Sequence, residues 1–137
     1  MTDRCFLDTN VLVYSIDESD SLKRRAANDL VVELSKSGNG IISTQVLQEF
    51  YNIITKKIGC PAEKARELVK KLSECFEVHT NSAHDIIRAI DISMRTKFSF
   101  WDSLILSASI ASECSVLYSE DLNDGQFVEN VRIVNPF

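Results

Sequence analysis

The sequence lacks the motifs that mark several common chemistries. It has no P-loop and no G-x-G-x-x-G run, so nothing in it predicts a bound nucleotide cofactor. Its four cysteines are scattered without a C-x-x-C pair, and His79 and His84 have no cysteine or carboxylate at ligand spacing around them. These absences argue against a zinc site, and they favour four reduced thiols in a cytosolic protein.

Long apolar segments and an excess of positive charge are missing too. No run approaches the ~20 residues of a membrane span, and no secretory signal is evident, so we expect a cytoplasmic protein without membrane contact. With 15 lysines and arginines against 20 aspartates and glutamates, the net charge is −5. Such a chain does not bind nucleic acid through bulk electrostatics. A nucleic-acid enzyme that uses a metal and a local basic patch remains compatible with it.

Short apolar strands alternate with amphipathic helices along the whole chain. We expect strands over residues 5–7, 41–42, 76–80, 116–118 and 131–134, and helices over 22–37, 46–58, 61–72, 82–95 and 104–111. This alternation is typical of a parallel sheet with helices on its faces. No linker or repeat divides the 137 residues. We therefore predict one three-layer α/β domain over residues 1–137, with a central parallel sheet of four to five strands and helices on both faces.

Four acidic side chains fall where strands end or where the following helices begin. They are Asp8, Glu49, Asp102 and Asp121. In a right-handed parallel arrangement these positions meet at one edge of the sheet, which is where ligands bind in open α/β folds. Asp102 fits this rule less directly, because a helix rather than a strand precedes it.

These carboxylates need a positive partner if they lie together. Glu49 shares a helix flank with the apolar Val46 and Ile53, so it is partly shielded from water. Two carboxylates ~4 Å apart repel by about 4 kcal/mol at an effective dielectric constant of 20. No lysine or arginine lies within the four motifs. A divalent cation is the economical answer, and ligation by oxygen alone points to Mg²⁺ or Mn²⁺.

Each acid also has an ordinary structural alternative. Asp8 could be only a helix cap, and Asp102 could be only the acid of a Ser99 capping box. Asp121 could belong to the polar turn 121–125, and Glu49 could be a solvated helix residue. The coincidence of all four at one edge favours the metal site.

Four stretches of the chain resemble the PIN-domain nucleases. They are F-L-D-T-N-V-L-V-Y at the start, then Q-E-F, F-W-D-S-L-I and L-Y-S-E-D-L-N-D-G-Q. The resemblance spans essentially the whole chain and is closest to the VapC-type toxins of prokaryotic toxin–antitoxin pairs. It implies a PIN-like fold and a metal-dependent endoribonuclease that hydrolyses RNA phosphodiesters with one or two Mg²⁺ or Mn²⁺ ions.

The resemblance also assigns roles to individual residues. The family's acidic quartet falls on the four acids named above, both as metal ligands and as catalytic groups. Asn10 and Ser119 would orient metal-bound water. Asp124 would be an extra outer acid, and it leaves open whether Asp121 or Asp124 is the fourth member. The partners implied are RNA, a second copy of the chain and a cognate antitoxin protein.

RNA phosphates need cations, which an acidic rim does not supply. The candidates are Lys23-Arg24-Arg25, Lys56-Lys57, and Arg95 with Lys97. Each is also explained as a solvated helix face. Among them we expect Arg95 and Lys97, just before the Ser99 capping box, to contact RNA. Trp101 beside Asp102 is expected in the core rather than stacked on a base.

Other functions fit less well. An aspartate-nucleophile phosphatase of the haloacid dehalogenase type needs a second aspartate two residues after the first, where this chain has Asn10. A receiver domain needs paired acids at its first strand, and these are missing. The stronger alternative is a PIN-like protein that binds RNA or a partner without cutting. Cleavage that needs added metal and is lost in Asp8→Asn separates the two.

Overall fold

A mostly parallel sheet forms the centre of the computed structural model, which describes residues 3–137. Within these residues the strand order is β3-β2-β1-β4-β6-β5, and only the β5–β6 pair is antiparallel. The strands are β1 (Cys5–Leu7), β2 (Gly40–Ser43), β3 (Glu77–His79), β4 (Val116–Tyr118), β5 (Phe127–Val128) and β6 (Val131–Val134). The predicted parallel sheet is confirmed, and β5 is a two-residue addition that the sequence pattern did not indicate.

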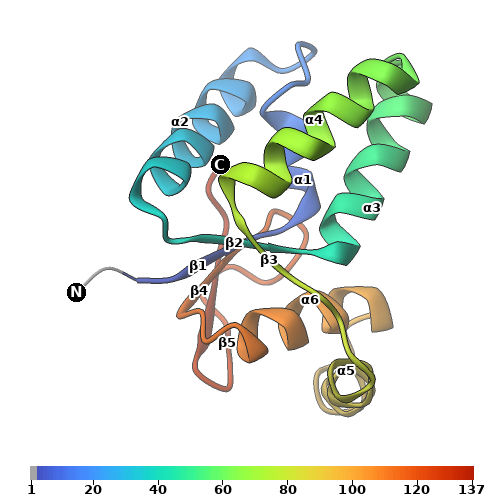
Figure 1. Cartoon of the computed structure of the whole chain (residues 1–137). Coiled ribbons are helices and arrows are strands. Elements are labelled where there is room, and N and C mark those ends of the chain that lie inside the picture. Colours follow the sequence, from blue (N-terminus) through green and yellow to red (C-terminus); the bar gives the residue numbers. More distant parts are fainter. Residues whose placement is uncertain (1–2) are drawn as a thin grey trace.

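Helices cover both faces of this sheet. They are α1 (Thr9–Tyr14), α2 (Ser21–Ser37), α3 (Thr44–Ile53), the π-helical turn η1 (Ile54–Ile58), α4 (Ala62–Cys75), α5 (Ala83–Thr96) and α6 (Phe100–Ala111). Figure 1 shows α1 to α4 on one side of the sheet and α5 with α6 on the other. The three-layer α/β architecture is therefore confirmed. No helix in residues 3–137 is both long and apolar enough to cross a membrane.

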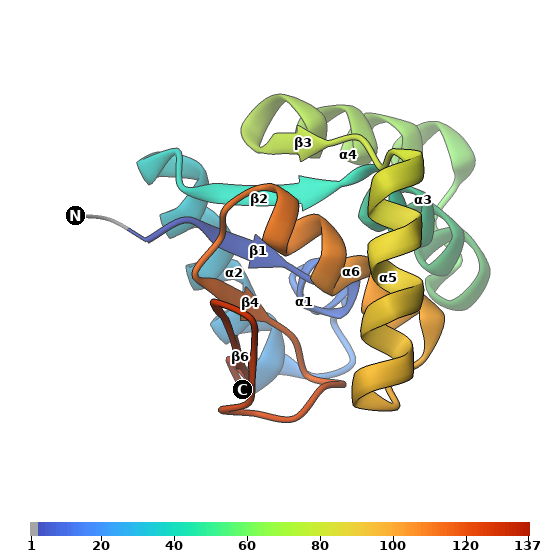
Figure 2. The same ribbon diagram turned by 90° about the horizontal axis from the view of Figure 1, so that it is seen from below.

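The central strands are apolar on both faces because both faces are covered. In β1, Phe6 and Leu7 are fully buried, and so are Ile41 and Ile42 of β2 and Leu117 of β4. Strands of a parallel sheet buried on both sides read as continuous apolar runs rather than as alternating ones. This explains why strands as short as three residues could be recognised. The parallel register Phe6–Ile41 and Phe6–Leu117 places β1 in the middle (Figure 2).

Helix ends follow the local signals with small shifts. Gly38 and Gly59 adopt left-handed backbone conformations and end α2 and η1, as expected for glycine at these positions. Ser82 and Asp85 form a capping box at the start of α5. Pro61 is the residue before α4 rather than its first residue, and α4 continues to Cys75, three residues beyond the predicted end.

The buried cysteines provide a test of this fold. Burial raises the pKa of the Cys5 thiol to about 11 and that of Cys114 to about 12, so both stay protonated and unreactive at pH 8. Cys75 is exposed at the end of α4. We predict that a disulfide reagent at pH 8 modifies Cys75 rapidly and spares Cys5 and Cys114, as measured by peptide mass spectrometry.

The matched control is the same reaction in guanidinium chloride, where all four thiols should react. Modification of Cys5 or Cys114 in the native protein as fast as that of Cys75 would contradict the core described above.

Candidate active site

All four predicted acids line one cleft at the carboxyl ends of β1 and β4. The cleft has a volume of about 360 Å³, and its lining includes Asp8, Glu49, Asp102 and Asp121 together with Asn10. Asp8 directly follows β1, and Asp121 lies three residues after β4. Glu49 comes from α3 and Asp102 from the first turn of α6. The topology thus brings together side chains from four segments of the chain.

Asp8 is the most deeply buried of these acids, with 5% of its surface exposed. It caps α1: its Oδ1 accepts a hydrogen bond from the Thr9 backbone N–H at 2.7 Å. Its Oδ2 accepts one from the Ser119 hydroxyl at 2.8 Å. Burial, reinforced by the nearby Glu49 and Asp102, outweighs these bonds and raises the pKa of the Asp8 carboxyl to about 7.

Glu49 is fixed from two sides. The Thr9 hydroxyl donates to its Oε1 at 2.7 Å, and the Gln45 amide lies 3.4 Å from its Oε2. The same amide donates to the Trp101 carbonyl at 3.1 Å, which ties α3 to the start of α6. The side-chain oxygen of Gln45, Oε1, is also buried and has no hydrogen-bond partner. An unpaired buried acceptor beside a group of carboxylates is a position that favours a cation.

Asp121 and Asp102 complete the cleft. The Asn10 side-chain amide donates to Asp121 Oδ2 at 2.8 Å, and the Asp121 backbone N–H donates to the Ser119 hydroxyl at 3.2 Å. Asp102 is half-buried, and burial together with the charge of Asp121 raises the pKa of its carboxyl even though the Ser99 hydroxyl stabilises the charged form. No salt bridge reaches any of the four acids within residues 3–137.

The residues present fit a hard divalent cation. Within the described part of the chain, no three histidine, cysteine or acidic side chains stand close enough to form a ready-made metal site. The donors are nevertheless all oxygens, burial and to a smaller degree the nearby Glu49 and Asp102 raise the pKa of Asp8, and Gln45 Oε1 has no partner. These are features that suit Mg²⁺ or Mn²⁺ rather than Zn²⁺. A bound ion would offset the mutual repulsion of these carboxylates.

The other candidate residues lie at different distances from the cleft. Ser119 is fully buried and contacts the cleft through its hydrogen bonds with Asp8 and with the Asp121 backbone N–H. Asp124 is exposed, accepts a hydrogen bond from the Asn135 backbone N–H at 2.8 Å, and does not line the cleft. Of the two candidates for the fourth acid, the geometry therefore favours Asp121.

The cations and the tryptophan are placed differently from the expectation. Neither Arg95 nor Lys97 lines the cleft: the Arg95 guanidinium lies 3.9 Å from the Glu129 carboxylate, and Lys97 ends α5. The cation that does line it is Lys57 of η1. Trp101 is 61% exposed rather than packed in the core, because its position in the first turn of α6 faces outward beside Phe100.

Sequence reasoning missed two groups of supporting residues. Gln45 precedes Glu49 by one helical turn, and this spacing was a usable signal for a shared face. Tyr14 and Lys23 both contact Glu120, the neighbour of Asp121, and the Tyr14 hydroxyl donates to Glu120 Oε1 at 2.9 Å. No local pattern indicated this second group, because its members come from segments about 100 residues apart.

Four carboxylates therefore line one cleft at the edge of a mostly parallel sheet that helices cover on both faces. Residues 5–127 match the family model of the PIN domain. The chain belongs to the PIN-domain family.

Solved structures share this fold. VapC20 of Mycobacterium tuberculosis, a sarcin–ricin-loop-cleaving toxin, superposes with a TM-score of 0.68 at 19% identity, over 85% of this chain and 89% of that chain. VapBC2 of Rickettsia felis, bound to a promoter DNA fragment, gives 0.68 at 21% identity over 94% and 96%. DNA-bound VapBC of Salmonella typhimurium gives 0.72 at 16% identity over 99% and 100%. No curated protein matches the sequence significantly.

The burial of Asp8 predicts a specific pH dependence of stability. Its folded-state pKa of about 7 lies above the unfolded value near 3.9, so the native protein binds the proton more tightly. Stability of the metal-free protein should therefore fall as pH rises from about 4 through 7. This decrease in the free energy of unfolding is at most on the order of 4 kcal/mol, and it should be absent in Asp8→Asn.

Urea unfolding in EDTA at several pH values measures this effect. We expect Asp8→Asn to exceed the wild type in stability at pH 8 and to match it near pH 4. Asp91→Asn, an exposed change on α5, is the matched control and should show no such gap. A gap that instead widens toward low pH would show that Asp8 is stabilised as the anion.

Proposed function

We propose that this protein is a metal-dependent endoribonuclease that hydrolyses RNA phosphodiester bonds, and that it is the toxin of a toxin–antitoxin pair. The observation that carries the proposal is the convergence of Asp8, Glu49, Asp102 and Asp121 in one cleft of a PIN-domain chain. No lysine or arginine pairs with these acids in the described residues, so their charge calls for a cation from outside the chain.

Mg²⁺ or Mn²⁺, as one or two ions, would be held by these four carboxylates. When bound, such an ion would lower the pKa of the attacking water and would stabilise negative charge on the phosphate. The chain's own part is orientation. Thr9 and Ser119 hold Asp8, the Thr9 hydroxyl also holds Glu49, and Asn10 holds Asp121. These bonds fix the acids before any ligand arrives.

The substrate class and partners are proposed from structural likeness. The Mycobacterium tuberculosis neighbour is described as a toxin that cleaves the sarcin–ricin loop, which supports RNA as the substrate. The neighbours from Rickettsia felis and Salmonella typhimurium are VapBC assemblies, and another is a toxin–antitoxin complex from Klebsiella pneumoniae. They support an antitoxin protein as partner. A second copy of this chain is proposed on the family resemblance alone.

One observation favours a second candidate function. The four acids line one cleft, yet no three of them are close enough in the described chain to form a ready-made metal site. A PIN-like protein that binds RNA or a partner without cutting would also have this arrangement. The phosphatase alternative has no such support. Asn10 stands where that class needs a second aspartate, and its side-chain amide donates to Asp121.

RNA cleavage with and without added metal separates the two functions. We predict that total bacterial RNA is cut by the wild type with Mg²⁺ or Mn²⁺ and not with EDTA. Asp121→Asn should reduce the rate by at least ~10-fold, because it removes a carboxylate from the cleft. Asp124→Asn is the matched control and should stay within about twofold, since it lies outside the cleft.

Two results would count against this account. Equal losses in both variants would make Asp124 part of the site. A wild type that is inert with both metals, yet still binds RNA, would favour the binding function.

A further inference from the structure

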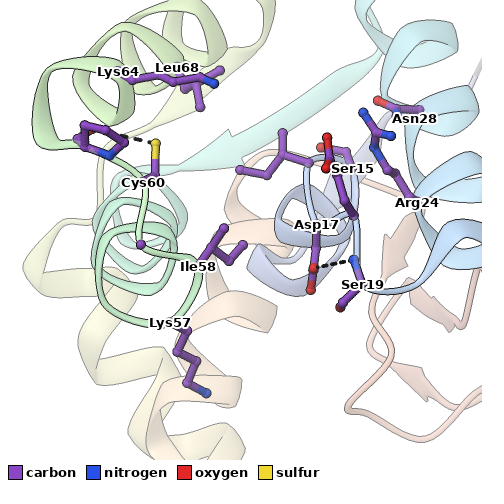
Figure 3. A pocket seen from close by; sticks show the side chains of 14 residues that line it. Ser15, Asp17, Ser19, Arg24, Asn28, Lys57, Ile58, Cys60, Lys64 and Leu68 are labelled. Atoms are coloured by element: carbon purple, nitrogen blue, oxygen red, sulfur yellow. Dashed lines mark hydrogen bonds between the residues drawn. The ribbon is translucent and has the colours of Figure 1, made fainter.

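A second, larger hollow adjoins the acidic cleft. It has a volume of about 820 Å³ and lies between the connection from α1 to α2 and the turn from η1 to α4 (Figure 3). Asp17 and Lys57 line both cavities, so the hollow continues the cleft away from the four acids. Its size is within the ~300–1,000 Å³ range of small-ligand sites, which is room for at least one nucleotide.

Three cations line this hollow: Arg24 of α2, Lys57 of η1 and Lys64 of α4. Figure 3 shows Arg24 and Lys64 on opposite walls. None of the three makes a salt bridge within residues 3–137. Five other basic side chains of the described residues do pair with carboxylates, namely Arg4, Lys23, Arg66, Arg88 and Arg95. The three cations of the hollow therefore belong to the basic side chains that no carboxylate of the described residues pairs with, and they line one cavity.

The acids of the hollow do not cancel this charge. Only Asp17 and Glu18 are acidic among its lining residues, and Asp17 is engaged by the backbone N–H of Ser19 at 3.0 Å. The cleft itself is the opposite: six acidic residues line it, and Lys57 is its one basic residue. An RNA strand whose scissile phosphate sits among the acids thus meets its first basic surface at Lys57 and then in the hollow.

The remaining surface suits a nucleotide as well. Ile16, Ile58 and Leu68 provide apolar area, and Asn28 and Ser15 provide hydrogen-bonding groups. A nucleotide combines these needs, because its phosphate is anionic and its base has an apolar face and polar edges. A different cleft between α2 and α4, lined by Val31, Val32 and Phe50 among others, is more apolar and offers less to a polyanion.

We infer that this hollow is a substrate subsite that binds the RNA segment flanking the cleaved phosphodiester. Lys57, Arg24 and Lys64 contact its backbone phosphates, and the isoleucines lie under a base. The inference rests on the proposed endoribonuclease function and names where the substrate runs outside the acidic cleft. It replaces Arg95 and Lys97, which lie outside the cleft, as the principal RNA contacts.

The test compares two triple variants of equal charge. One removes the cations of the hollow, and the other removes neighbouring exposed cations that do not line it. The variants are Arg24→Gln/Lys57→Gln/Lys64→Gln and Arg25→Gln/Lys56→Gln/Lys70→Gln. The probe is a fluorescein-labelled, random-sequence single-stranded RNA of twelve nucleotides. Anisotropy is read with Ca²⁺ in place of Mg²⁺, and a gel checks that the RNA stays intact.

We expect the hollow variant to bind the RNA at least ~10-fold more weakly than the wild type. The slope of log K against log salt should become less negative by about 2, because three phosphate contacts are lost. The control variant should change affinity only about twofold. Calorimetry with Mn²⁺ should give the same number of bound ions for both variants and the wild type, which shows that the fold and the acids are intact.

Three outcomes overturn the inference. Equal weakening in both variants means that only bulk charge matters. If the hollow variant binds RNA as tightly as the wild type, the strand does not run through the hollow. In that case, metal-dependent cleavage by the wild type would still support the proposed function. Unchanged RNA binding together with lost binding of a co-expressed antitoxin would make the hollow a protein site. The proposed function, by contrast, is wrong if the wild type neither binds Mn²⁺ nor cleaves RNA.

Discussion

The buried carboxylate of Asp8 is the constraint on which the site depends. It stands where the central strand β1 turns into α1, and it is held by a backbone N–H on one side and by the Ser119 hydroxyl on the other. Burying a carboxylate without a cation is costly, and the raised pKa of Asp8 expresses that cost. The fold tolerates it because hydrophobic burial around Phe6 and Leu7 stabilises the sheet independently. The buried Asp8 carboxylate therefore lowers the free energy of unfolding of the metal-free protein, at the position where a metal would be bound.

The neighbouring side chains link this carboxylate to the rest of the cleft. Thr9 contacts both Asp8 and Glu49, so a single residue couples the first strand to α3. Asn10 couples the same turn to Asp121 after β4. The residues of one short turn, 8–10, therefore set three of the four acids. A change in this turn should disturb the whole cleft, whereas a change at Asp124 should leave it in place.

Local sequence was enough to place the four acids and was not enough to find what surrounds them. Asp8 and Asp121 follow short apolar runs that are typical of buried strands, and parallel topology then brings strand ends to one edge. The Gln45 amide and the cations of the hollow depend on contacts between segments far apart in the chain, for which composition and periodicity carry no signal. The basic pair Arg95 and Lys97 was favoured because it precedes Asp102 in sequence, but neither residue lines the cleft, and Arg95 lies beside Glu129 instead. β5 was missed because two residues are too few to show alternation.

We propose that these acids bind a divalent cation. Isothermal calorimetry with Mn²⁺ on the wild type and on Asp8→Asn is the measurement to make first, because it needs no knowledge of the RNA. We expect the wild type to bind one or two ions and the variant to bind none. If the wild type binds no ion, or if Asp8→Asn binds as many as the wild type, the buried carboxylate does not serve a metal and the claim is contradicted.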